Sequence, residues 1–291
     1  MPFAEKNGIR IAYEERGSGA PFVLVSGIGM QLVSWPDELL DGLASRGLRV
    51  ITLDNRDVGL STQLREAGVP PMRKLLARAM AKLPVQVPYT LYEMAGDVAM
   101  LLDTLGIACA HVGGVSLGGM VAQAFAIRHG DRLASLTSIM SHSGGRSLTG
   151  RPAAVGRLVK GPPRSREEAI QLQLEFFRAA GSTRFTRDET ALGHRIGLAY
   201  DRSFHPAGFA RQLAAVLGTG DMRPGLSGVR AKTLVLHGTD DGIFDVDCGR
   251  ATAKAIPGAE LVVIDGWGHD LAEGVIPTVC DLVAAHVHAS A

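Results

Sequence analysis

Alternating strand-like and helix-like stretches constrain the fold of this chain most. Residues 21–25 and 48–53 are short runs that close at Gly or Asp, as buried parallel strands do. Between them, residues 37–46 carry a helical pattern that ends at Gly47. The alternation continues with a helix at 92–105, a strand at 110–115, a helix at 117–129 and a strand at 133–140. Consecutive βαβ units predict an α/β fold with a mainly parallel sheet and helices on both faces.

The strand pattern disappears between about residues 144 and 230, where Gly, Pro and Arg interrupt short helical pieces. The rest of the chain predicts strands at 232–237 and 260–264 and a terminal helix at 275–288. A chain of 291 residues is long enough for one large domain that carries an insertion. We therefore assign residues 1–143 and 231–291 to one core, and residues 144–230 to an inserted helical cap.

Composition and charge exclude several classes of partner. The chain has 30 basic and 29 acidic side chains, and this balance gives no overall field that would attract nucleic acid. The N-terminal residues lack a basic and apolar leader pattern, and no stretch reaches the roughly 18 apolar residues of a membrane span. We expect a cytoplasmic protein that binds no nucleic acid and makes no stable membrane insertion. A homodimer is left open.

The cysteines and histidines show no metal-binding pattern. Cys109, Cys248 and Cys280 are odd in number, scattered and without a C-x-x-C pair, which argues against a disulfide framework and a zinc site. The histidines form no motif such as H-E-x-x-H. We expect the cysteines to be small buried apolar side chains, and we expect no metal and no organic cofactor.

One serine, Ser116, lies in a pattern typical of catalytic nucleophiles. Residues Gly114–Gly119 form a G-x-S-x-G motif between a predicted strand and a predicted helix. In this context the serine occupies a tight, strained turn, and a side chain at either flanking glycine would collide with neighbouring backbone. The alternatives are a glycine turn with an incidental serine and a phosphate-binding loop, although the motif contains neither G-x-G-x-x-G nor G-K-[ST].

One histidine and two aspartates follow later strands. His269 comes directly after the predicted strand at 260–264, at the edge where open α/β sheets bind ligands; an incidental turn histidine is the alternative. Asp240 and Asp241 follow the preceding strand, so either supplies a carboxylate in the chain order Ser, Asp, His. A serine hydroxyl becomes reactive when a histidine takes its proton and a carboxylate holds that histidine in register. We therefore predict Ser116 as nucleophile, His269 as base and one of the two aspartates as the acid.

Together these motifs resemble the α/β-hydrolase superfamily, and the resemblance covers nearly the whole chain. The matching stretches are Gly114–Gly119, His237–Asp241 and Gly266–His269. In that superfamily the acid is the last residue of an H-G-x-x-D stretch, which implies Asp241 rather than Asp240. The resemblance also implies an oxyanion hole made by the backbone N–H groups of Ile28 and Leu117. For Ile28, the alternative is a purely structural core side chain.

Two loops, Ser26–Glu38 and Asp54–Thr62, are similar to those of a narrower group, the aclacinomycin methylesterase-like hydrolases of actinobacteria. Most superfamily members carry His-Gly after the early strand, whereas this chain has Ser26 and Gly27, and the methylesterase group also lacks the histidine. The second loop contains the superfamily's D-x-R-x-x-G-x-S turn. The resemblance implies that the charged residues of this turn brace loops rather than react.

These observations predict a serine-dependent carboxylic ester hydrolase that acts through an acyl-enzyme on a small-molecule ester. The same triad also supports C–C bond, thioester and lactone hydrolysis and perhydrolysis, and the fold does not choose among them. A ligand receptor on a hydrolase scaffold is the alternative outside enzymes. The expected substrates are methyl esters of bulky apolar acids, because the resemblance implies a small alcohol and the predicted cap is rich in apolar side chains. These are Leu172, Leu174, Phe176, Phe177, Leu192, Ile196, Leu198, Tyr200, Phe204 and Phe209.

Residues 64–82 form a basic segment whose apolar side chains have near-helical spacing. Its basic residues, set against the single acid Glu66, are Arg65, Arg73, Lys74, Arg78 and Lys82. Such a segment is either a basic amphipathic lid or a solvated helix that packs on the cap.

Overall fold

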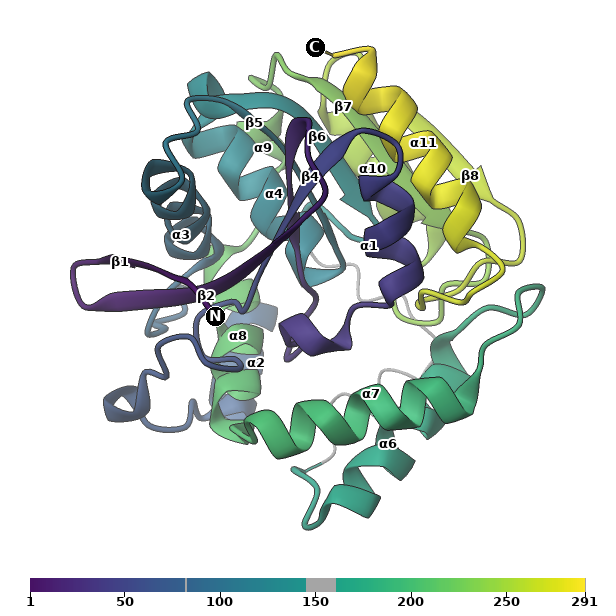
Figure 1. Ribbon diagram of the computed structural model, residues 1–291. Helices are drawn as coiled ribbons and strands as arrows, with labels where there is room; N and C mark the ends of the chain where they lie inside the picture. The colour runs from purple at the N-terminus through teal and green to yellow at the C-terminus, as the bar shows by residue number, and fades with distance from the viewer. Residues whose placement is uncertain (82, 145–160, 291) are drawn as a thin grey trace.

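An eight-stranded, mostly parallel sheet forms the centre of the molecule (Figure 1). The computed structural model describes residues 1–81, 83–144 and 161–290. The strands lie in the order β1-β2-β4-β3-β5-β6-β7-β8. β1 pairs with β2 and β2 with β4 in antiparallel fashion, and the other neighbours are parallel, which confirms the predicted α/β fold. The bounds are β1 Phe3–Lys6, β2 Ile9–Arg16, β3 Ala20–Val25, β4 Leu48–Leu53, β5 Ala110–Val115, β6 Leu133–Ile139, β7 Lys232–Gly238 and β8 Glu260–Ile264.

Both faces of the sheet are apolar and covered by helices. Along β3, Phe22 and Leu24 belong to one hydrophobic cluster, whereas Val23 and Val25 belong to the other. This burial on both sides explains why β3 is a continuous apolar run in the sequence. The first cluster includes side chains of α1 (Asp37–Ala44) and α11 (Ile276–His288), and the second includes those of α3 (Leu91–Thr104), α4 (Leu117–Arg128) and α10 (Val246–Ala255).

Local sequence signals set the starts of two of these helices. Thr90 and Glu93 form a capping box at the start of α3. The Glu93 side chain accepts the N–H of Thr90, and the Thr90 side chain accepts a backbone N–H in the first turn of the helix. α11 carries Pro277 in its first turn, where the missing backbone N–H would have no intrahelical acceptor.

The described residues between β6 and β7 form helices and loops but no strand, and we call residues 161–230 the helical segment. Its helices are α6 Arg166–Ala180, α7 Glu189–Arg202, α8 Pro206–Thr219 and α9 Arg223–Leu226. α6 and α7 lie side by side and away from the sheet (Figure 1). α8 packs against α3, and α9 packs against α4 and α10. Residues 145–160 of the predicted cap lie outside the described residues.

The basic stretch at 64–82 contains α2 (Met72–Met80), which packs against α8. This contact favours the second alternative, a helix that packs on residues of the predicted cap; Lys82 lies outside the described residues. Within the parts of the chain that the structure describes, no helix is long and apolar enough to cross a membrane.

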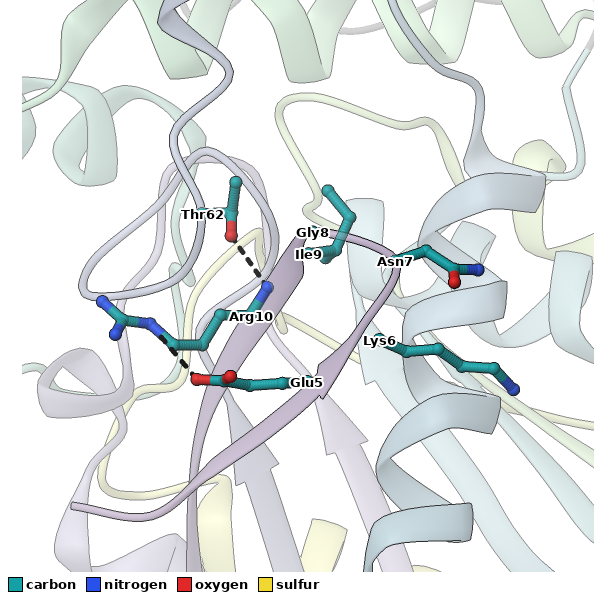
Figure 2. A pocket seen from close by; sticks show the side chains of 7 residues that line it. All are labelled: Glu5, Lys6, Asn7, Gly8, Ile9, Arg10 and Thr62. Atoms are coloured by element: carbon teal, nitrogen blue, oxygen red, sulfur yellow. Dashed lines mark hydrogen bonds and ion pairs between the residues drawn. The ribbon is translucent and has the colours of Figure 1, made fainter.

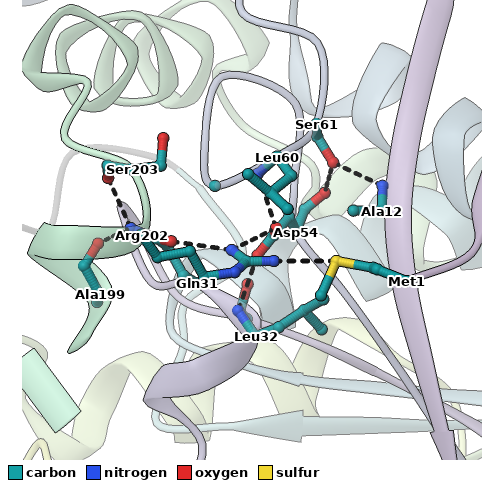
Figure 3. A network of polar contacts seen from close by, with 12 residues as sticks. Met1, Ala12, Gln31, Leu32, Asp54, Leu60, Ser61, Ala199, Arg202 and Ser203 are labelled. Atoms are coloured by element: carbon teal, nitrogen blue, oxygen red, sulfur yellow. Dashed lines mark hydrogen bonds and ion pairs between the residues drawn. The ribbon is translucent and has the colours of Figure 1, made fainter.

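A buried charge connects α7 to the turn that follows β4 (Figure 3). Arg202 at the end of α7 lies 2.7 Å from the carboxylate of Asp54, which is fully buried. Asp54 also accepts the backbone N–H groups of Leu32 and Leu60, at 2.8 and 2.9 Å. Arg202 donates a further hydrogen bond to the side chain of Gln31 at 2.9 Å. The buried carboxylate therefore has one cation and two backbone donors to replace water.

A second buried pair joins the same turn to α8. Arg211 donates to both carboxylate oxygens of Asp57, at 2.8 and 2.7 Å, and both side chains are buried. Asp57 also accepts the N–H of Leu64 at 2.8 Å. Bidentate pairing fixes the direction of the side chains as well as their distance. The charged residues of this turn therefore brace loops, as the resemblance implied.

The prediction that all three cysteines are buried is wrong for one of them. Cys248 and Cys280 are buried, but Cys109 is exposed. Cys109 lies in the turn between α3 and β5, where the chain runs over the surface.

Candidate active site

Ser116 lies at a strained turn between β5, which ends at Val115, and α4, which begins at Leu117. Its φ of 55° and ψ of −118° fall outside the regions that side-chain-bearing residues ordinarily adopt. The backbone of Ser116 is held on both sides, because its N–H donates to Ile139 at 2.9 Å and its carbonyl accepts the Ser141 hydroxyl at 2.7 Å. The strained backbone is therefore held by the last residue of β6 and by the loop that follows it.

The flanking glycines are required by close backbone contacts. A Cβ at Gly114 would overlap the backbone of Gly118, and a Cβ at Gly118 would overlap the carbonyl of Val25 at the end of β3. The steric reason predicted for the G-x-S-x-G spacing is confirmed. Because β3 and α4 approach this closely, the loop after β3 passes directly beside Ser116: a Cβ at Gly27 would lie 3.7 Å from the Cβ of Ser116.

His269 and Asp241 meet Ser116 from the ends of β8 and β7. The Nε2 of His269 lies 3.0 Å from the Ser116 Oγ, and its Nδ1 lies 2.8 Å from the Asp241 Oδ2. An ionised carboxylate only accepts hydrogen bonds, so Nδ1 is the protonated nitrogen and Nε2 is free to accept the serine proton. The structure thus brings together three residues that are 153 and 28 positions apart in the chain.

Comparison with known proteins places the chain in a family. Residues 20–273 match the family described as alpha/beta hydrolase fold. The chain belongs to this family. The resemblance seen in the sequence is thereby confirmed, and the hydrolase fold accounts for nearly the whole chain.

The relatives of this hydrolase are named for different reactions. Rhodomycin D methylesterase DnrP of Streptomyces peucetius is 26% identical, over 93% of this chain and 92% of that protein. The 2-hydroxy-6-oxononadienedioate/2-hydroxy-6-oxononatrienedioate hydrolase of Burkholderia vietnamiensis is 29% identical, over 90% and 85%. Among solved structures, a thermophilic esterase from Thermogutta terrifontis is 26% identical with a TM-score of 0.71, over 99% and 97%.

The carboxylate of Asp241 is held in its charged form in this hydrolase. Its Oδ1 accepts the N–H groups of Ile243 and Phe244, both at 2.8 Å. Burial would raise the pKa of Asp241, but the charge and hydrogen bond of His269 and the Phe244 N–H hold this pKa below its ordinary value. The base therefore has an ionised partner across the neutral pH range.

His237 lies behind this carboxylate. Its Nε2 is 2.9 Å from the carbonyl of Phe244 and 3.6 Å from Asp241, and the ring is fully buried. Because a carbonyl only accepts, Nε2 carries the proton. Burial lowers the pKa of His237 and outweighs the opposing effect of Asp241, so the ring stays neutral. His237 therefore acts as a dipole that supports the Phe244 turn rather than as a second cation beside His269.

Asp240, the other candidate acid, is directed elsewhere. Its carboxylate accepts the hydroxyl of Thr183, and also that of Thr239 at 3.0 Å. Asp241, and not Asp240, is hydrogen-bonded to His269.

The end of α6 joins the acid and base loops, which the sequence did not indicate. The carbonyl of Ala180 accepts the N–H of Gly242, next to Asp241, at 3.1 Å and the N–H of His269 at 2.8 Å. One carbonyl therefore contacts both loops of the triad. A Cβ at Gly242 would press on Ala180, so this glycine allows the close approach.

Asp270 extends this connection from the residue next to the base. It is 3% exposed and accepts the N–H of Ser182 at 3.0 Å, the hydroxyl of Ser182 at 2.6 Å and the guanidinium of Arg187 at 2.5 Å. The Ser182 hydroxyl also accepts the N–H of Gly268 at 3.0 Å. We call residues 180–187, which connect α6 with α7, the triad connection.

The two predicted oxyanion donors lie on either side of Ser116. Leu117 is the first residue of α4, where backbone N–H groups and the helix dipole favour negative charge. Ile28 follows β3 in the loop beside Ser116, and its half-buried side chain packs against the hydrophobic core. Among the described residues, neither N–H has a hydrogen-bond acceptor of its own. The position of Ile28 is therefore compatible with both roles, a backbone donor in the oxyanion hole and a side chain that packs in the core.

A separate hollow lies at the β1–β2 hairpin (Figure 2). Its polar groups pair with one another, since Arg10 donates its N–H to Thr62 at 2.8 Å and its guanidinium lies 3.9 Å from Glu5. Its lining residues are Glu5, Lys6, Asn7, Gly8, Ile9, Arg10 and Thr62, and they include no residue of the Ser116 site.

Proposed function

We propose that this protein is a serine-dependent carboxylic ester hydrolase. The observation that carries the proposal is the position of His269, 3.0 Å from the Ser116 hydroxyl and 2.8 Å from the Asp241 carboxylate. A histidine in this geometry activates a serine and stays oriented while it holds the proton.

In the first half of the proposed reaction, the Ser116 Oγ bonds to the ester carbonyl carbon while His269 Nε2 takes the hydroxyl proton. The carbonyl π electrons move to the oxygen, and the N–H groups of Ile28 and Leu117 stabilise the resulting oxyanion. The carbonyl then re-forms, the bond to the alcohol oxygen breaks, and the alcohol leaves with the proton from His269. The product of this half is an acyl ester on Ser116.

Water completes the proposed reaction. His269 takes a proton from a water molecule, the water oxygen bonds to the acyl carbon, and the second oxyanion uses the same two donors. When it collapses, Ser116 leaves with the proton held by His269, and the acid is released. The chain needs no other reactant than water.

For the substrate, we propose methyl esters of bulky apolar acids, with the helical segment acting as a cap over the site. The similarity to rhodomycin D methylesterase supports a small alcohol. Phe209 of α8 supports an apolar acyl pocket, because it lies next to the loop beside Ser116: a Cβ at Gly29 would be 3.0 Å from its ring. Burial of apolar surface contributes roughly 25 cal/mol per Å² to binding before the costs of association.

C–C bond hydrolysis is the second candidate, because a 2-hydroxy-6-oxononadienedioate hydrolase is among the relatives of this chain, at 29% identity. The same triad could serve that reaction, in which the bond that breaks joins two carbons.

A fluorophosphonate probe tests the catalytic assignment. We expect rapid covalent labelling at Ser116, located by peptide mass spectrometry, and no labelling of Ser116→Ala. Equal labelling of the two proteins would exclude Ser116 as the nucleophile.

The substrate assignment is tested by kcat/KM for methyl esters of large ring acids, short-chain acetates, long-chain esters and a vinylogous 1,5-diketone acid. We expect the ring methyl esters to give the highest value. A preference for acetates or long chains would contradict the proposed substrate, and turnover of the diketone acid alone would favour the second candidate.

A further inference from the structure

Gln212 on α8 connects the helical segment with two core loops, the loop beside Ser116 that contains Gly29 and the turn after β4 that contains Arg56. It is fully buried, and both ends of its amide are used. Its Oε1 accepts the N–H of Gly29 at 2.8 Å, and its Nε2 donates to the carbonyl of Arg56 at 2.9 Å. Because one end meets a donor and the other an acceptor, the orientation of the amide is fixed.

The loop that Gln212 contacts is the one that carries Ile28. Within it, the carbonyl of Gly27 accepts the N–H of Met30 at 3.2 Å. All peptide bonds described are trans, and the carbonyl and N–H of a trans peptide point in opposite directions. The N–H of Ile28 belongs to the same peptide unit as the Gly27 carbonyl, so it points away from Met30. The turn therefore uses the N–H groups of Gly29 and Met30 and leaves that of Ile28 for another acceptor.

Two further contacts hold the ends of this turn. Asn55 donates to the carbonyl of Ser26 at 3.0 Å, and the Ser26 hydroxyl donates to the carbonyl of Met30 at 3.1 Å. Gly29 has a φ of +68°, a conformation that glycine adopts without strain. The middle of the turn, at Gly29, is held by Gln212.

The other contact of Gln212 is itself firmly held. Arg56, whose carbonyl accepts from Gln212, donates to both carboxylate oxygens of Asp97 at 2.6 Å, and both side chains are buried. Gln212 also follows Arg211, which is paired with Asp57. The side chain therefore extends from a helix that is fixed on the core to a turn that has few other restraints at its centre.

From this arrangement we propose that Gln212 is a positioning residue for the oxyanion hole: it holds the peptide unit of Gly29 so that the adjacent N–H of Ile28 faces the substrate carbonyl at Ser116. This inference rests on the proposed ester hydrolysis. It assigns to α8 a part in catalysis that is exerted through the Ile28 loop, without contact with the reacting atoms.

The expected effect is on the transition state. Loss of one oxyanion donor in comparable sites lowers kcat by about 10²–10³-fold, and a misplaced donor loses part of that stabilisation. The ester carbonyl of the bound substrate carries little of the charge that the donor stabilises. Removal of the Gln212 amide should therefore lower kcat and leave KM nearly unchanged.

The test compares three variants, each assayed per active site after titration with a fluorophosphonate. Gln212→Met removes both hydrogen bonds at similar size, and Gln212→Glu keeps an acceptor for the Gly29 N–H. Gln123→Met is the matched control, because Gln123 is also fully buried and its amide donates to Ser138, away from the Ile28 loop.

We expect Gln212→Met to lower kcat by about 30–300-fold and to weaken binding of a boronic acid, a tetrahedral adduct former, by a similar factor. We expect Gln212→Glu to recover at least about tenfold of that loss, and Gln123→Met to keep kcat close to that of the wild type. If Gln212→Met does not fold, Gln212→Asn, which withdraws the acceptor from Gly29, takes its place with the same expectation.

A kcat for Gln212→Met close to the wild-type value, or equal losses in Gln212→Met and Gln123→Met, would overturn the inference. A rise in KM with kcat unchanged would also overturn it and indicate a role in substrate binding. Failure of the proposed function is seen separately, because it would appear as wild-type protein that is not labelled at Ser116.

Discussion

Two of the attachments between the helical segment and the α/β core contact different loops. At the triad connection, the Ala180 carbonyl and the Ser182 hydroxyl contact the loops of Asp241 and His269, and Asp270 also pairs with Arg187. At the turn after β4, the attachment consists of two buried ion pairs, Asp54 with Arg202 and Asp57 with Arg211. The first attachment contacts the loops of Asp241 and His269 directly, and the second contacts the β4 turn, which is hydrogen-bonded to the loop after β3.

This difference separates effects on rate from effects on stability. A hydrogen bond contributes about 1 kcal/mol net, or about 1.5–3 kcal/mol when one partner is charged, but a small displacement of a catalytic group changes the rate strongly. Breaking a buried ion pair leaves an uncompensated charge and costs about 3–5 kcal/mol of stability. We therefore expect changes at the triad connection to lower kcat, and changes at the β4 turn to lower the free energy of unfolding.

The largest effect is expected at the acid itself. Asp241→Asn should lower kcat by about 10⁴-fold, because an amide no longer fixes the tautomer of His269. Asp240→Asn should have a far smaller effect, because its carboxylate binds Thr183 and Thr239. Steady-state kinetics of the two variants measure this. The reverse ranking would move the acid to Asp240 and contradict the observed hydrogen bond.

The next effect tests the attachment at the β4 turn. Arg202→Met leaves the fully buried Asp54 without its cation and should lower the free energy of unfolding by about 3 kcal/mol, while kcat per titrated site changes little. Arg178→Met is the control in the same segment, because Arg178 pairs with Glu189 at the surface, where solvent screens the pair and its loss should change stability little. Urea unfolding monitored by circular dichroism gives both values. Equal losses in the two variants would show that burial of the Asp54 pair has no special effect.

Most of the core and the triad could be predicted from the sequence because their signals are local. The strand β3 beside Ser116 is an apolar run whose residues alternate between two hydrophobic clusters, and the G-x-S-x-G motif lies within six consecutive residues, Gly114–Gly119. The choice of Asp241 over Asp240 came from the family resemblance, since two adjacent aspartates in a turn have the same local pattern. The exposure of Cys109 was missed because a small residue before a strand gives no signal of its side.

The attachments of the helical segment could not be predicted in the same way. Gln212 and Gly29 are 183 positions apart, and Ser182 and Asp270 are 88 apart. Neither pair belongs to a motif, and a glutamine or serine in a helical region is usually a surface side chain. The Ala180 carbonyl has no side-chain signal at all. Such contacts depend on how helices that are remote in the chain come to rest on the sheet.

The smallest effect is expected at Ser182, and it distinguishes the two attachments most directly. The hydroxyl of Ser182 donates to Asp270 and accepts the N–H of Gly268, so it touches the residues on both sides of His269. Ser182→Ala removes both bonds, yet Asp270 keeps the N–H of Ser182 and the guanidinium of Arg187. We therefore expect stability to fall by about 1–2 kcal/mol and kcat by about tenfold, with KM unchanged. Ser182→Thr, which keeps the hydroxyl, should restore the rate. Arg202→Met should show the opposite pattern, a large loss of stability and a small loss of rate. If Ser182→Ala lost stability as Arg202→Met does while kcat per titrated site stayed at the wild-type value, the triad connection would hold the fold rather than the base, and the contrast between the two attachments would be wrong.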